Sequence, residues 1–149
     1  MTRLWRTLAP LIITGSALAC SRDTTSPVDP VAGDYTATSF VTTPTGGPST
    51  DQLAAGSTVN LVLDADYVTA GQLHIAASGS TPASDTDMVG TWTHIGNAVD
   101  LNQPLDSFMR DMIFLIDKSS DGTMTLVGDQ IIGGTRIQLT LTRVVLAED

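Results

Sequence analysis

The chain is almost without the charged residues that favour helices: its 149 residues include one lysine, Lys118, and one glutamate, Glu148. Threonine, glycine and valine are abundant instead. Threonine and valine favour strands because their branched side chains fit the pleated surface of a sheet. No long apolar pattern with the period of a helix follows residue 20, and no repeat of solenoid length is present. The folded part of the chain is therefore predicted to be all-β.

Short segments in which apolar and polar residues alternate are separated by turn signals, as half-buried strands require. Expected strands span residues 33–43, 58–64, 71–77, 88–95, 98–101 and 112–116, and two more carry Met124 with Leu126 and Ile137 with Leu139 and Leu141. Gly96-Asn97 predicts a tight hairpin. Residues 119–122 and Gly133-Gly134 predict the last two turns.

Two longer connections are expected, at residues 44–57 with one helical turn at 51–55, and at 78–87 as a polar loop. Residues 112–116 are apolar throughout, so their pattern does not select a buried face. About eight antiparallel strands predict a meander that closes into a barrel, with a two-sheet sandwich as the alternative. Closure also removes exposed sheet edges.

Residues 1–19 have the pattern of an export signal. Arg3 and Arg6 precede a mainly apolar run at 8–19, which ends with small residues at Ala17 and Ala19. That run is too short to cross a bilayer core, which needs about 20 residues, and it suits a signal peptide. A retained anchor helix is the remaining alternative.

Cys20, the sole cysteine, follows this segment directly. The stretch Ala17-Leu18-Ala19-Cys20 resembles the lipobox of bacterial lipoproteins, which implies lipid attachment at Cys20 and a membrane as partner. Simple secretion after cleavage at Ala19 is the alternative. Ser21 follows the cysteine where aspartate would retain a protein at the inner membrane, and by resemblance this favours the outer membrane. Residues 20–31 are then a lipidated tether, and residues 32–149 a single domain.

The mature chain is strongly acidic, with five basic and sixteen acidic residues and a net charge of −11 after residue 19. Nucleic acid is excluded as a partner because phosphate binding needs clusters of lysine and arginine. The charge also argues against electrostatic adhesion to anionic lipid. Because the only cysteine is at position 20, the mature fold has no internal disulfide.

Chemistry-bearing motifs are sparse. His74 and His94 are the only histidines, lie at no metal-ligand spacing, and are expected on the surface. The acid pairs at 64–66 and 85–87 lie in loops, where turn capping or a weak calcium site would explain them. No nucleophile elbow, phosphate loop, dinucleotide fingerprint or zinc-protease motif is present. We therefore expect no enzyme activity, no cofactor and no metal.

Gly33-Asp34-Tyr35 opens the first expected strand where lipocalins carry Gly-x-Trp, and Arg143 ends the last one. With the long connection after the first strand, this pattern resembles small lipocalin-like bacterial lipoproteins over residues 33–145. The resemblance implies an eight-stranded barrel in which Arg143 lies over the first-strand aromatic residue, Tyr35. A frayed strand end is the alternative for Arg143.

Two functions remain open for such a barrel at the cell envelope. One is binding of a small apolar or amphipathic ligand, with inward aliphatic residues lining a cavity. The other is a filled barrel that serves as a structural module or contacts another envelope protein. The residues expected to bind the ligand or to close the barrel are Tyr35, Trp92, Phe114 and Arg143.

Overall fold

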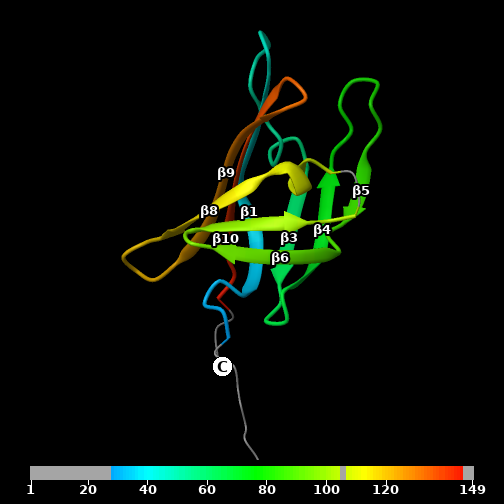
Figure 1. The fold of residues 1–149 in the computed structure, drawn as a ribbon. Helices are drawn as coiled ribbons and strands as arrows, with labels where there is room; N and C mark the ends of the chain where they lie inside the picture. The colour runs from blue at the N-terminus through cyan, green and yellow to red at the C-terminus, as the bar shows by residue number, and fades with distance from the viewer. Residues whose placement is uncertain (1–27, 105–106, 146–149) are drawn as a thin grey trace, which may run out of the picture.

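The structure is a computed structural model that describes residues 28–104 and 107–145 (Figure 1). The expected signal peptide, Cys20 and most of the expected tether lie outside these residues. Within the two described ranges, no helix is long and apolar enough to cross a membrane.

Ten strands and one short helix make up the described chain. The strands are β1 (Gly33–Pro44), β2 (Thr50–Asp51), β3 (Thr58–Leu63), β4 (Val68–Ile75), β5 (Ser84–Asp87), β6 (Gly90–Ile95), β7 (Ala98–Asn102), β8 (Ile113–Lys118), β9 (Met124–Ile132) and β10 (Thr135–Arg143). A 3-10 helix, η1 (Phe108–Asp111), precedes β8.

Eight of these strands form a closed antiparallel barrel in the order β10-β9-β8-β7-β6-β4-β3-β1. The ring closes where β1 pairs with β10, from Tyr35 opposite Arg143 to Pro44 opposite Thr135. β2 and β5 are additions that pair with β1 and β4. The prediction of an all-β, eight-stranded barrel is confirmed, and the closed ring excludes the sandwich.

The expected polar loop at 78–87 contains a strand that the sequence analysis did not identify. β5 pairs with β4, and His74 Nδ1 lies 2.7 Å from the Asp85 carboxylate across the two strands. Three of the four β5 residues are exposed, so no apolar alternation marks this strand. At the other connection, the Ala55 N–H donates to the Asp51 carbonyl oxygen at 3.1 Å, in a single turn of helical type.

The structure selects the buried face of the apolar segment at β8. Met112 and Phe114 are buried, whereas Ile113 and Leu115 are half exposed on the outside. Phe114 pairs with the buried Val99 of β7, and residues that pair across a sheet share one face. The strand register therefore identifies the buried face of β8, which the apolar pattern alone does not.

Large side chains fill the interior of the barrel. Those with essentially no accessible surface are Trp92, Tyr35, Phe40, Phe114, Leu61, Leu63, Met88, Leu101, Met109, Met112, Leu126 and Leu139. Gly128 of β9 faces the same interior. A Cβ there would lie 2.4 Å from Met112 Cε, the flexible end of that side chain, and 3.1 Å from Phe114 Cε1, so both side chains would have to shift to admit one. An eight-stranded barrel is just wide enough for its side chains to fill, and this one is filled.

We predict that Gly128→Val destabilises the fold by about 1–3 kcal/mol, although valine suits a strand better than glycine does. The new side chain must displace Met112 and Phe114. Urea unfolding measures the change. Thr125→Val on the outer face of the same strand is the control, with an expected change within about 0.5 kcal/mol. A Gly128→Val protein as stable as the parent would show that the interior has free space.

Candidate functional site

The chain turns back onto the barrel just before β1, at residues 29–32, which we call the N-terminal turn. The Ala32 N–H donates to the Asp29 carbonyl oxygen at 3.0 Å, and the Val31 N–H donates to the Asp29 carboxylate at 2.9 Å. Aspartate and proline at Asp29-Pro30 both favour such a turn. Val31 and Ala32 are buried, so packing against the barrel begins before residue 32, where the sequence analysis placed the start of the domain.

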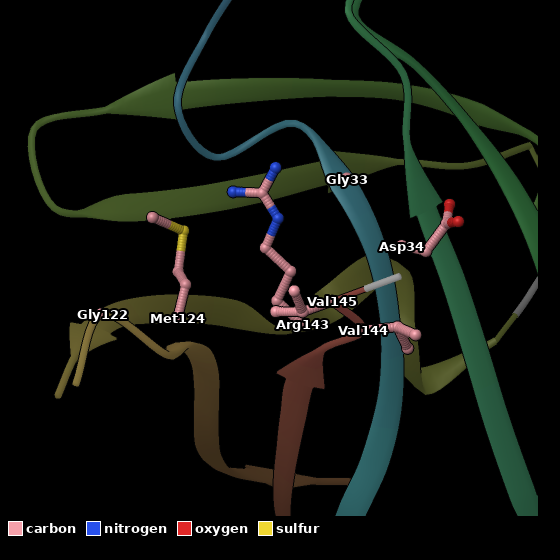
Figure 2. Close-up of a pocket in the computed structure, with 7 residues that line it drawn as sticks. All are labelled: Gly33, Asp34, Gly122, Met124, Arg143, Val144 and Val145. Carbon is pink, nitrogen blue, oxygen red and sulfur yellow. The ribbon is translucent and has the colours of Figure 1, made fainter. Parts of the chain in front are cut away.

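Arg143 reaches from the end of β10 to the N-terminal turn (Figure 2). Its Nη1 donates to the Pro30 carbonyl oxygen at 2.9 Å, and its Nη2 donates to the Ala32 carbonyl oxygen at 2.6 Å. The side chain passes over Gly33, where a Cβ would lie 2.6 Å from Nε. Hydrogen bonds from a charged donor are stronger than neutral ones, so Arg143 fastens the turn to the barrel.

Tyr35 lies opposite Arg143 in the β1–β10 ladder and points into the barrel. Its hydroxyl donates to the Val31 carbonyl oxygen at 2.7 Å and lies 3.2 Å from Met124 Sδ. Burial raises the pKa of Tyr35 to about 12, against the opposing effect of the Arg143 charge. The neutral phenol of Tyr35 is therefore a second group that holds the N-terminal turn on the barrel.

His94 of β6 holds the same turn from a third strand. Its Nδ1 lies 2.9 Å from an Asp29 carboxylate oxygen, and its Nε2 lies 2.9 Å from the Gly96 carbonyl oxygen. Both partners are acceptors, so both contacts are hydrogen bonds only when the ring carries a proton on each nitrogen. His94 is half-buried, with 24% of its side chain exposed, and it contacts Asp29 where the sequence analysis expected a solvated surface histidine. We call Tyr35, His94 and Arg143 together the clasp.

Trp92 and Phe114 lie in the packed interior and not at the clasp. Trp92 Nε1 donates to the Asp64 carbonyl oxygen at 2.9 Å, and its ring packs against Tyr67 in a tilted arrangement, with the ring centroids 5.0 Å apart. The structure therefore brings Tyr35 and Arg143 together and leaves the other two predicted residues as core. The remaining predicted site residue, Cys20, lies outside the described residues.

Two cavities open on the surface of the described chain. One, at the clasp end, has a volume of about 410 Å³ and is lined by Gly33, Asp34, Gly122, Met124, Arg143, Val144 and Val145 (Figure 2). The other, of about 270 Å³, lies on the outer face of β8 and β9 and is lined by Ile113, Leu115, Val127, Asp129 and Gln130. Neither is lined by the interior aromatic residues Trp92 and Phe114.

Of the two acid pairs, one caps a turn and the other makes a side-chain contact with a histidine. The Asp64 carboxylate accepts from the Asp66 N–H at 3.0 Å, and Asp85 pairs with His74. Across residues 28–104 and 107–145, no group of three or more histidine, cysteine, aspartate or glutamate side chains is placed to hold a metal ion.

Sequence reasoning missed the contact of Asp29 with His94 because it joins residues 65 positions apart that carry no shared motif. The sequence contains one signal for the inward orientation of His94. His94 has the same strand parity as Trp92, so in a regular strand it faces inward at the barrel end.

Comparison with known proteins gives no relative from which to transfer a function. No protein-family model matches the chain, and neither a curated protein nor a solved structure matches it. Function is therefore inferred from the residues and their geometry.

We predict that Arg143→Ala loosens the N-terminal turn and lowers the free energy of unfolding by about 1–2 kcal/mol, because two charged hydrogen bonds are lost. Hydrogen exchange should quicken at the Val31 and Ala32 amides, by about tenfold per 1.4 kcal/mol. Arg136→Ala is the control, since Arg136 pairs with Asp129 on the exposed surface. Equal exchange at Val31 and Ala32 in both variants would refute the fastening role of Arg143.

We predict that the folded protein loses stability in alkali through Tyr35. Between the ordinary pKa of 10.0 and the folded value of about 12, the unfolded chain has released the phenol proton and the folded chain has not. The free energy of unfolding then falls by about 1.4 kcal/mol per pH unit in that window. Urea unfolding at several pH values measures the slope, and Tyr35→Phe should make it shallower. An unchanged slope in Tyr35→Phe would contradict the assignment.

Proposed function

We propose that this chain is an extracytoplasmic protein, anchored by lipid on Cys20, whose filled barrel serves as a protein-interaction or structural module of the cell envelope. The observation that carries the choice is the packing of the interior. The side chains that would line a ligand cavity have no accessible surface, and two of them, Met112 and Phe114, lie directly against Gly128. A closely packed core leaves no space for an apolar ligand.

The polar atoms of the interior aromatics support the same choice. The Tyr35 hydroxyl donates to Val31 and the Trp92 Nε1 donates to Asp64, so the protein's own carbonyl groups satisfy both. A ligand site usually offers a few polar groups that await the ligand. Tyr35 and Trp92 instead use their polar atoms in hydrogen bonds within the protein.

An apolar row on the outer face supports the interaction role. Ile95 pairs with Ala98, Ala98 with Leu115, and Leu115 with Val127, so these residues follow one another across β6, β7, β8 and β9. Ile95 and Leu115 are exposed. Exposed apolar patches on a soluble surface often mark protein contacts.

The anchor is supported by the segment that precedes the domain. The basic start, the short apolar run and the single cysteine at its end are the features of a lipoprotein signal. We expect Cys20→Ala to move the protein from the membrane fraction to the soluble fraction, because stable attachment depends on the acyl chains. Membrane retention of the Cys20→Ala protein would refute the anchor.

Native mass spectrometry of the unlipidated chain from residue 21 tests the filled barrel. We expect the mass of the protein alone. A lipid-sized adduct that survives Arg143→Ala would refute the proposal and restore the ligand-binding barrel.

Photo-crosslinking from Leu115 in intact cells tests the interaction role. We expect one defined envelope protein to be captured, and to be lost in Val127→Asp but kept in Ala70→Asp, an exposed change on the outer face of β4. Capture that is insensitive to Val127→Asp would exclude the apolar row as the contact surface.

The cavity at the clasp end supports a second candidate function, binding of a small amphipathic molecule at the rim of the barrel. Met124, Val144 and Val145 supply an apolar lining, and the Arg143 guanidinium supplies charge. An adduct in the same mass spectrum that is lost in Arg143→Ala would favour this function.

A further inference from the structure

The path of the chain sets which end of the barrel is nearest to Cys20. The chain enters the described structure at Val28, next to the clasp, and the end of β10 returns to the same place, where the Val144 N–H donates to the Asp34 carbonyl oxygen at 2.7 Å. The turn between β3 and β4 lies at this end too, because Leu63 pairs with Gly33 at the start of β1 (Figure 1). We call this end, with residues Val28, Tyr67, Val144 and Val145, the anchor-side face.

The anchor-side face exposes apolar side chains. Val28, Tyr67, Val144 and Val145 are all exposed, and a cavity lined by Met124 opens among them beside Val144 and Val145. The loops at the opposite end, residues 45–49 and 78–83, consist of threonine, glycine, proline, serine and alanine. The anchor-side face therefore differs in character from these two loops, although Ile131 near the Gly133-Gly134 turn is exposed as well.

The clasp keeps the anchor-side face close to the attachment point. Tyr35, His94 and Arg143 hold residues 29–32 on the barrel, so Val28 lies next to the clasp. Val28 follows Cys20 by eight positions, and even a fully extended chain of eight residue steps spans only about 26–29 Å. A short tether gives a high effective concentration, at which weak apolar contacts form.

We propose that the anchor-side face rests on the headgroup region of the bilayer that holds the lipid of Cys20. The proposal rests on the lipid anchor proposed above. Valine and tyrosine side chains supply the contact, since amphipathic aromatic rings favour the membrane interface. Asp34, Asp64 and Asp66 lie at the same end, and negatively charged lipid repels their carboxylates. The proposed contact is therefore made by the apolar side chains, and anionic lipid weakens it.

The test uses the lipidated full chain in zwitterionic phosphatidylcholine vesicles. In that protein Cys20 carries lipid, so a single introduced cysteine takes a fluorescent label. Val145→Cys places the label on the anchor-side face, and Ile131→Cys on β9, near the turn at Gly133-Gly134, places it toward the other end. The two positions are matched, since Val145 is 78% exposed and Ile131 is 73% exposed. Quenchers attached to the lipid chains near the headgroups report contact.

We expect loss of fluorescence at residue 145, none at residue 131, and a smaller loss at residue 145 when anionic lipid is added. Co-flotation of the protein with the vesicles tests the lipid anchor separately. Protein that floats without quenching at residue 145, or with equal quenching at both positions, overturns the membrane contact and leaves the anchor standing. Protein that does not float overturns the anchor, and the membrane contact with it.

Discussion

Close packing of the barrel interior is the constraint on which the rest of the structure depends. Met112 and Phe114 lie against Gly128, and aromatic rings from β1 and β6 fill the remainder together with buried leucine and methionine side chains. Eight strands enclose about as much volume as their own inward side chains require. Because large side chains take up that volume, the surfaces of the described chain that remain open to a partner are the outer face and the rim.

The rim shows how the barrel end is covered. Tyr35, His94 and Arg143 come from three different strands, and each holds the backbone or the side chain of residues 29–32. A turn of the chain itself thus covers this end, and the Tyr35 hydroxyl, the His94 ring and the Arg143 guanidinium find partners in that turn. The same contacts join the barrel firmly to the segment that leads to Cys20.

Much of the fold could be predicted because its signals are local. Alternation placed Val59, Leu61 and Leu63 on the inner face, and they are buried; Gly96-Asn97 forms the expected hairpin. β5 is solvated and shows no alternation of apolar and polar residues. β8 begins with four consecutive apolar residues, so its sequence pattern does not select a buried face. The resemblance implied that Arg143 lies over Tyr35, with a frayed strand end as the alternative, and the register places the two residues opposite each other. That the guanidinium binds the carbonyl groups of residues 29–32 depends on tertiary structure, which no local pattern encodes.

The closure of the ring has a consequence for the order in which the protein is assembled. β1 is the first barrel strand to leave the ribosome or an export channel, and β10, its partner, is the last. Until β10 arrives, one edge of β1 has no partner, and unpaired edges invite association with other chains. Long-range pairing of this kind also folds slowly. The nascent chain therefore needs protection until its final strand is available, and a chain truncated before β10 should aggregate.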